Sequence, residues 1–292
     1  MKQTVRNMLG RWRWSHSVAH YYPVHPRPRW GQGLPRHAQL TAALERWRSN
    51  YENALNDIAS HKAKLAQVPY ERSQGLPQTA FWYNCWFTGI DAVSLLTFLW
   101  THRPTRYLEI GSGHSTMFAR YAVTLGNLPT TITSIDPHPR AEIDLLCDQV
   151  IRRPLEECDV SVFDALGAGD ILFFDGSHRA FTNDVTVFFF EVLPRLQPGV
   201  LVHVHDIFLP EDYPAVFNDR LYSEQYLLGA MLLCPTQPFE VKLPNYFATA
   251  DPVLGGKIRD ILRVENGRRD IPVCNGSFWL EMKGGCAQSA IC

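Results

Sequence analysis

Apolar and polar residues follow two different periods along this chain. Over residues 37–67 the apolar positions recur every three or four residues with charged residues on the opposite side, which predicts an amphipathic helix. A second helix is predicted over residues 89–101, shortly before a proline. Residues 1–37 are rich in proline, arginine and aromatic side chains and have no regular period, so we expect an extended arm there.

Beyond residue 104, short apolar segments alternate with segments of helical period. Such nearly continuous apolar runs are typical of strands in a parallel sheet that helices cover on both faces. We therefore predict an α/β fold with a doubly wound sheet over residues 80–292, preceded by the arm and the amphipathic helix within residues 1–79. The predicted strands are 106–111, 130–136, 149–156, 170–175, 198–206, 239–243 and 276–283, and the predicted helices among them are 114–125, 139–149, 183–196 and 223–234.

The composition is that of a globular protein: of 292 residues, 46% are hydrophobic and 20% are charged, and the net charge is −1. No apolar run approaches the ~20 residues of a transmembrane helix, and the first residues lack the apolar core of a signal peptide. The seven cysteines include no Cys-x-x-Cys pair, which favours reduced thiols over disulfides or a structural zinc site. We therefore expect a cytoplasmic protein.

The charge is unevenly distributed along the chain. Residues 1–44 contain seven basic residues and no acidic ones, whereas the remainder has 21 basic and 29 acidic residues. Such an arm can bind a phosphate-rich partner or an anionic membrane surface. The interpretation that we favour is that it packs against the acidic remainder of its own chain or of a second subunit, with no nucleic acid as a partner.

A glycine-containing turn follows the first predicted strand. It reads Gly111-x-Gly113-x-x-Thr116, so it lacks the third glycine of the NAD-binding fingerprint. Asp136 ends the second strand, where a carboxylate accepts hydrogen bonds from both hydroxyls of a ribose. Glu109, two residues before Gly111, suits an ammonium group. S-adenosylmethionine carries both groups and is the predicted cofactor; the alternative is a tight turn beside a solvated strand end.

Four segments, LEIGSGHST, ITSIDPHPR, DILFFDGSH and LQPGVLVHVHDIFLPEDYP, occur in an order and spacing that resemble those of class I S-adenosylmethionine-dependent methyltransferases. The resemblance covers roughly residues 80–285. It implies a Rossmann-like fold with a seven-stranded sheet, mostly parallel, in which the last strand is antiparallel. It also implies a set of cofactor-binding residues: Glu109, Gly111 and Gly113 at the methionine part, Asp136 at the ribose and Leu155 near the adenine.

Acidic residues and histidines cluster after the fourth and fifth predicted strands. Asp175 and His178 follow the fourth strand, and the fifth ends in the sequence HVHD. Side chains alternate along a strand, so His203 and His205 share one face. Asp175, His205 and Asp206 are placed to converge on one metal ion, with His178 as a general base. The alternative for the two strand histidines is a hydrogen-bonded position near the edge of the sheet.

Within the methyltransferases, this cluster resembles a divalent-metal-dependent subgroup that includes the macrolide-sugar O-methyltransferases and relatives of cephalosporin hydroxylase. In that pattern an Asp-x-x-His supplies a metal carboxylate and the base, and an acidic pair after the fifth strand completes the site. Asp175 and His178 match it, and Asp206 matches half of the pair. His205 departs from it, because an imidazole replaces a carboxylate. Mg²⁺ prefers oxygen ligands, so the expected ion is Mg²⁺ or Mn²⁺, a softer ion, or none.

Residues near these segments are candidates for the acceptor pocket. Glu211, Asp212 and Tyr213 follow the fifth strand and are predicted to form a lid over the acceptor. On the next predicted helix, Gln225 or Tyr226 either contacts the acceptor or lies on the helix surface. An aromatic-rich stretch before the sheet is expected in the core or in the pocket wall: Trp82, Tyr83, Asn84 and Trp86.

These features predict an enzyme, a methyltransferase that acts on a hydroxyl of a small molecule or glycan. His178 is the expected base, and Asp175 and Asp206 are expected to hold an ion or a polar network that lowers the pKa of the hydroxyl. One alternative is a metal-dependent hydrolase or oxygenase that uses the His/Asp cluster directly, and another is a non-catalytic scaffold with the same fold. The helix over residues 38–66 can pack against its own domain or against a second copy, so we also consider a homo-oligomer.

Overall fold

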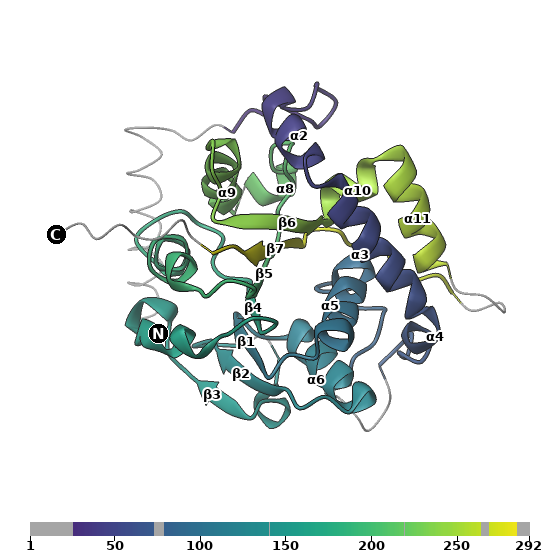
Figure 1. The fold of residues 1–292 in the computed structure, drawn as a ribbon, viewed down its shortest axis with the longest axis vertical. Coiled ribbons are helices and arrows are strands. Elements are labelled where there is room, and N and C mark those ends of the chain that lie inside the picture. Colours follow the sequence, from purple (N-terminus) through teal and green to yellow (C-terminus); the bar gives the residue numbers. More distant parts are fainter. Residues whose placement is uncertain (1–25, 73–78, 140, 219, 264–268, 285–292) are drawn as a thin grey trace, which may run out of the picture.

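Seven strands form one mixed sheet in the computed structural model, which describes residues 26–72, 79–139, 141–218, 220–263 and 269–284. The strand order is β3-β2-β1-β4-β5-β7-β6, with β1 to β5 parallel and β7 antiparallel to both of its neighbours (Figure 1). The predicted fold class is thereby confirmed. The strands are β1 (Arg106–Ile110), β2 (Thr131–Ile135), β3 (Gln149–Ile151), β4 (Ile171–Phe174), β5 (Leu201–Val204), β6 (Phe239–Pro244) and β7 (Phe278–Met282).

Helices cover both faces of the sheet. They are α2 (Ala38–Glu45), α3 (Arg48–Ser60), α4 (Lys62–Leu65), α5 (Gly89–His102), α6 (His114–Gly126), α7 (Asp184–Val187), α8 (Ala215–Asn218), α9 (Glu224–Leu233), α10 (Asn245–Ala250) and α11 (Pro252–Leu262). Short 3₁₀ or π segments are η1 (Asp144–Leu146), η2 (Leu155–Glu157), η3 (Val160–Ala165), η4 (Phe188–Val192) and η5 (Leu193–Arg195). Helices α3, α5, α6 and α11 gather on one face (Figure 1), and α7 with η4 packs against the other.

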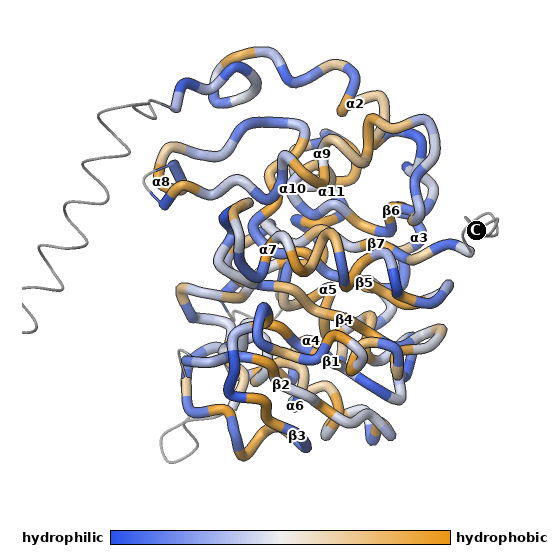
Figure 2. Tube along the Cα trace, turned by 90° about the vertical axis from the view of Figure 1, so that its left-hand side faces the viewer, coloured by the Kyte–Doolittle hydropathy of each residue, from blue (hydrophilic) through white to orange (hydrophobic). Residues whose placement is uncertain are grey.

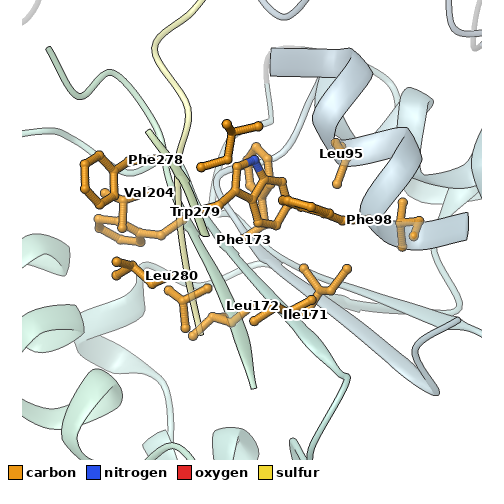
Figure 3. Packing of buried hydrophobic residues seen from close by; sticks show 14 of the residues in the cluster. Leu95, Phe98, Ile171, Leu172, Phe173, Val204, Phe278, Trp279 and Leu280 are labelled. Carbon is orange, nitrogen blue, oxygen red and sulfur yellow. The ribbon is translucent and has the colours of Figure 1, made fainter. Parts of the chain in front are cut away.

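Successive side chains of the central strands point to opposite faces of the sheet. Phe174 of β4 stacks on Phe188 of η4, with ring centroids 4.0 Å apart. Its neighbour Phe173 points to the opposite face, where Phe98 of α5 packs edge-on against Trp279 of β7 (Figure 3). Apolar residues accordingly dominate the central strands (Figure 2). Both faces of β4 are buried, as its continuous apolar run predicts.

The predicted helix over residues 37–67 is divided into α2, α3 and α4. Its apolar stripe is buried within the chain: Tyr51, Leu55 and Ile58 of α3 are at most 1% exposed, and α3 contacts α5, α11 and β6. These residues belong to the same hydrophobic cluster as the strands of the sheet. Of the two packing arrangements considered, the structure shows the one within the chain, whereas the domain boundary at residue 79 and a homo-oligomer stay predictions.

The prediction of a helix over residues 139–149 is wrong. Among its described residues only η1 forms, because Asp148 is tied to β2 instead. Its backbone N–H donates to the carbonyl of Ile132 over 2.8 Å, and its Oδ2 accepts from the N–H of Ile132 over 2.7 Å. Arg120 donates to the same carboxylate over 2.7 Å. A helix through Asp148 would break all three bonds.

Helices α10 and α11 are absent from the sequence prediction, although α11 has a recognisable start. Asp251 accepts hydrogen bonds from the N–H groups of Val253 and Leu254, both over 2.9 Å, and Pro252 occupies the first helical position. A capping aspartate followed by proline is a frequent beginning of a helix. The sequence therefore contained a local signal for α11.

The described part of the basic arm packs against the loop that follows β5. We call residues 29–36 the strap. Arg29 and Trp30 donate their backbone N–H groups to Asp212 Oδ2 over 2.6 and 3.0 Å, and Arg36 Nε donates to Glu211 Oε1 over 2.8 Å. This is the favoured packing within the chain; residues 1–25 of the arm lie outside the described residues. No described helix is long and apolar enough to span a membrane.

Candidate functional site

A cavity of about 620 Å³ opens where the carboxyl ends of β1, β2, β4 and β5 meet. Backbone hydrogen bonds join the strand ends there, from Gly111 N to Ile135 O (3.0 Å) and from Asp175 N to Ile110 O (2.9 Å). The volume lies in the range of cofactor and small-molecule sites. Most of the predicted site residues line this cavity: Gly111, Gly113, Asp136, Leu155, Asp175, His178, His205 and Asp206.

The two glycines of the first turn have different roles. Gly111 has a φ of +78°, and a Cβ at this position would lie 1.8 Å from the carbonyl oxygen of Asp175. Only glycine therefore allows the ends of β1 and β4 to approach so closely. A Cβ on Gly113 would meet no atom within 4 Å, and Gly113 lines the cavity. The space beside Gly113 is thus open for a ligand that contacts the backbone.

Asp136 lies next to this turn on the wall of the cavity. Its Oδ2 accepts a hydrogen bond from the N–H of Ser112 over 2.7 Å, and its Oδ1 accepts one from the N–H of His138 over 2.7 Å. Each oxygen of a carboxylate has two lone-pair sites, so one remains on each for the two hydroxyls of a ribose. The turn and Asp136 together fit the nucleoside part of S-adenosylmethionine.

The chain turns along the cavity after β3, which is shorter than predicted and ends at Ile151. Leu155, at the start of η2, is 2% exposed and lines the cavity. Arg152 holds this crossing in place by donating to the carbonyl of Asp136 over 3.0 Å and to Ser134 Oγ over 3.2 Å. Leu155 thus gives the cavity an apolar side chain, which suits the flat face of an adenine.

Glu109 lies beneath the turn rather than on the cavity wall. It is fully buried and accepts hydrogen bonds from Tyr107 Oη over 3.2 Å and from Thr116 Oγ1 over 2.5 Å. Thr116 Oγ1 in turn accepts from the N–H of Gly113 over 3.0 Å. Burial raises the pKa of Glu109 to about 8, against the opposing effect of these hydroxyl donors. Glu109 therefore supports the turn from behind instead of lining the methionine part of the cavity.

His178 is buried among three carboxylates. Its Nδ1 lies 2.5 Å from Glu224 Oε1, and its Nε2 lies 3.0 Å from Asp175 Oδ1 and 3.8 Å from Asp206 Oδ2. Tyr222 stacks on the ring, with centroids 4.2 Å apart. Burial lowers the pKa of His178, but the charge of Glu224 and the hydrogen bonds to Glu224 and Asp175 outweigh it and raise this pKa well above its usual value. The protonated form of the ring is therefore favoured.

Glu224 is the main candidate that the sequence analysis misses as a site residue. It is fully buried, and burial raises its pKa while the His178 imidazolium opposes that change. In the sequence it stands at the start of a predicted helix. The helix dipole favours an acidic residue at this position, so Glu224 does not by itself indicate a functional site. Its partner is 46 residues earlier, so no local pattern links the two.

Two residues of the cluster have left-handed backbones. His178 has a φ of +61° and Asp206 has a φ of +54°. Residues other than glycine adopt this conformation at a cost, and they do so mainly where surrounding contacts fix them. The carbonyl of His178 accepts hydrogen bonds from the N–H groups of Ser223 (2.7 Å) and Glu224 (3.3 Å). These bonds tie the loop after β4 to the start of α9 and hold the imidazole against Glu224.

The two histidines of the fifth predicted strand share a face, as alternation predicts, but only one reaches the cavity. His203 is fully buried, lies 2.7 Å from Ser277 Oγ through its Nε2 and stacks on Phe173. It does not line the cavity, so the hydrogen-bonded core position is the one observed. His205 lines the cavity, and its Nε2 lies 3.7 Å from Asp206 Oδ1.

The predicted metal ligands come together without forming an ion site. Asp175 faces His178, and within the described part of the chain no group of three or more His, Cys, Asp or Glu side chains is arranged to hold a metal ion. Asp175 Oδ1 and Asp206 Oδ2 instead face His178 Nε2, at 3.0 and 3.8 Å. This arrangement gives no support to the predicted metal site of Asp175, His205 and Asp206, which stays a prediction.

The predicted lid is not part of the cavity. Glu211 and Asp212 bind the strap, as described above, and neither lines the cavity. Gln225 is buried and bridges the loop after β5 by accepting from the N–H of Phe208 over 2.8 Å. Tyr226 is half exposed and donates to Asp212 Oδ1, also outside the cavity.

The aromatic stretch before the sheet serves both of the roles considered for it. Trp82 is 3% exposed and packs on Phe118 in the core, whereas Trp86 lines the cavity. Asn84 orders the turn between them, because its Oδ1 accepts from the N–H groups of Trp86 and Phe87 over 3.0 and 2.8 Å. The stretch therefore contributes to the cavity wall only at its end.

Comparison with known proteins gives a family match over about a third of the chain. Residues 108–207 match a family model described as a methyltransferase domain, and the matched segment runs from β1 to just beyond β5. Among solved structures, the chain is similar to the SAH-bound methyltransferase PaMTH1 from Podospora anserina, with a TM-score of 0.42 and 14% identity over 87% of this chain and 100% of that one. A comparison with curated proteins gives no match.

Proposed function

We propose that this chain is an S-adenosylmethionine-dependent methyltransferase that acts on a hydroxyl of a small molecule or glycan. One observation carries the proposal: Asp136, with a lone-pair site left on each oxygen, stands beside the open space at Gly113 in a cavity of cofactor size. A ribose diol and a backbone-contacting chain both find partners on that wall. The match of residues 108–207 to a methyltransferase domain supports the same activity.

The cofactor, when bound, supplies an electrophilic methyl group on a positively charged sulfur. Asp136 accepts hydrogen bonds from the ribose hydroxyls, and Leu155 packs against the adenine. Gly113 leaves room for the amino-acid part beside the turn. Glu109 and Thr116 keep the N–H of Gly113 in place from behind, so the wall is formed before the ligand arrives. Such preorganisation lowers the entropic cost of binding.

The acceptor hydroxyl is activated by the pair formed by Asp175 and His178. The bound cofactor would supply its methyl group to the hydroxyl oxygen, and the electron pair of the broken sulfur–carbon bond would stay on sulfur. The hydroxyl proton passes to Asp175 Oδ1, which faces His178 Nε2 at 3.0 Å. This proposal gives the role of base to Asp175 and not to His178, the base expected from the sequence, because the protonated form of His178 is favoured. Glu224 holds His178 Nδ1 and fixes the ring, which is the role of the third group in such arrangements.

Calorimetric titration with S-adenosylhomocysteine tests the cofactor site. Asp136→Ala should weaken binding by about tenfold or more, because it removes a charged hydrogen-bond acceptor for two hydroxyls. His178→Ala should leave the dissociation constant within about threefold of wild type, since His178 holds the acceptor side. Asp164→Ala is the matched control, because Asp164 is 55% exposed and does not line the cavity.

Two results of this titration would contradict the proposal. A wild-type protein that takes up no S-adenosylhomocysteine at millimolar concentration is not this kind of enzyme. Equal affinity of wild type and Asp136→Ala would show that the ligand binds somewhere other than this wall. With binding established, transfer of a labelled methyl group to an acceptor oxygen, and its loss in His178→Ala, tests the chemical step.

A further inference from the structure

The end of the cavity next to the His178 cluster has aromatic walls. Tyr222 stacks on His178, and Phe217 lies beside Tyr222 with ring centroids 5.2 Å apart. Phe87 lies against His205 at a centroid distance of 5.4 Å. All three aromatic residues line the cavity. This end of the cavity is therefore shaped for a flat, apolar group, and it lies away from the nucleoside wall at Asp136.

Arg220 lines the same end of the cavity. Its guanidinium carbon lies 5.9 Å from the ring centroids of both Phe217 and Tyr222, and its Nη1 is 3.5 Å from Tyr222 Oη. In the described part of the chain, no carboxylate forms an ion pair with Arg220. The ring of Tyr222 thus has His178 stacked on it and the guanidinium of Arg220 near it. A group that binds Arg220 therefore lies about the width of one aromatic ring from Asp175 and His178, the pair proposed to activate the acceptor.

Arg220 carries a permanent positive charge, which is unusual in the lining of this cavity. Among the described lining residues it is the only lysine or arginine, whereas five lining residues carry carboxylates: Asp136, Glu156, Asp175, Asp184 and Asp206. An acidic lining suits a cationic cofactor and disfavours an anion. A guanidinium at the acceptor end, beside an aromatic wall and without a carboxylate partner among the described residues, reverses this preference locally.

We infer that the acceptor is an aromatic hydroxy acid. This inference rests on the proposed function and specifies its substrate. The ring of the acceptor lies between Phe87 and Tyr222, its hydroxyl meets Asp175, and its carboxylate binds the guanidinium of Arg220. Planar carboxylates match the paired N–H donors of arginine, which gives orientation as well as affinity. Methyl transfer to the hydroxyl proceeds as described above, and the carboxylate of the acceptor is unchanged.

Matched probes test this inference on the full chain loaded with S-adenosylhomocysteine. The probes are 4-hydroxybenzoate and 4-hydroxybenzamide, which share the ring and hydroxyl and differ in charge. Wild type should bind the acid about tenfold more tightly than the amide. Arg220→Gln should reduce that preference to about twofold or less, while its affinity for the amide stays within about twofold of wild type. Arg103→Gln, at the far end of α5, is the control and should keep the full preference.

Three outcomes would overturn the inference: equal binding of acid and amide by wild type, full preference retained in Arg220→Gln, or no binding of either probe at millimolar concentration. The first measurement, binding of S-adenosylhomocysteine to wild type, separates these outcomes from failure of the proposed function. If the cofactor product binds and the probes are not distinguished, only the acceptor class is wrong. If it does not bind, the methyltransferase proposal is wrong as well.

Discussion

Asp136 and Glu109 stand at the same turn in the sequence, but the structure gives them opposite surroundings. Asp136 is bound by two backbone N–H groups at the cavity wall, where its charge is solvated and available. Glu109 is enclosed behind the turn among hydroxyl donors, where its neutral form is favoured. Two carboxylates next to one turn therefore differ: Asp136 lines the cavity and is available to a ligand, whereas Glu109 supports the turn from behind.

The raised pKa of Glu109 predicts a pH-dependent stability. This carboxyl ionises near pH 4.5 in the unfolded chain but only near pH 8 in the folded protein. Between these values the folded state binds one proton more, so the free energy of unfolding falls with rising pH, by up to about 1.4 kcal/mol per unit. Glu109→Gln should lack this fall, so its stability relative to wild type should increase from pH 5 to pH 8.

Urea unfolding of both proteins at pH 5, 6.5 and 8 measures this difference. Glu156→Gln is the control, because Glu156 is exposed. Parallel pH profiles of wild type and Glu109→Gln would falsify the assignment of a neutral, buried Glu109.

Single residues of the site differ in how far the sequence could predict them. Gly113, Asp136, Asp175 and Asp206 follow apolar strands, and the ends of parallel strands meet at one edge, so their convergence was predictable. Glu224 was not, because its contact with His178 depends on the path of the whole loop after β5. Sequence spacing likewise does not show that His178 lies between the carboxylates that were predicted to bind a metal ion.

At the scale of elements, the strap, the loop after β5 and α9 form one connected unit. The strap binds Asp212, and the carbonyl of Glu211 accepts a hydrogen bond from Gln225 Nε2 over 3.2 Å. Gln225 is next to Glu224, which holds His178. The strap therefore steadies the helix start that positions the imidazole, although it lies outside the cavity.

Asp212→Asn should loosen the strap. It replaces a buried carboxylate that accepts from two backbone N–H groups, and we expect a loss of roughly 1–3 kcal/mol in the free energy of unfolding. Hydrogen exchange at the amides of Arg29 and Trp30 should become faster than in wild type. Asp57→Asn, at an exposed position of α3, is the control and should leave these exchange rates unchanged. Unchanged exchange in Asp212→Asn would show that other contacts hold the strap.

The spacing of hydrophobic residues predicted most of the helices and strands. It gave wrong predictions where tertiary contacts determine the local secondary structure. The strands of the sheet and helices α5 and α6 follow from their apolar patterns. Residues 139–149 have a helical pattern as well, yet the bonds between Asp148 and β2 prevent the helix. The division of residues 37–67 into three helices has no clear sign in that pattern, and α11 was missed although its Asp-Pro start is visible.

At the scale of the whole molecule, the cavity joins parts of the chain that are far apart in sequence. Its lining runs from Cys85 to Cys274 and includes the ends of four parallel strands. A ligand held there contacts the folded state only, because no part of the unfolded chain presents these groups together. Binding must therefore stabilise the whole fold.

S-adenosylhomocysteine at one hundred times its dissociation constant should add about 2.7 kcal/mol to the free energy of unfolding. For a protein of this size, that corresponds to a rise of about 5 °C in the melting temperature. Differential scanning calorimetry measures the shift, and Asp136→Ala at the same ligand concentration should show much less of it. A wild-type melting temperature that does not respond to the ligand would speak against the cavity as its site.

The segment that matches the methyltransferase family ends at residue 207, and the aromatic and basic wall of the acceptor end does not belong to it. Phe87 precedes that segment, and Phe217, Arg220 and Tyr222 follow it. An engineer who exchanged only residues 79–88 and 208–222 would leave the glycine turn and Asp136 untouched. Under the proposed function, the choice of acceptor could then be changed separately from the supply of the methyl group.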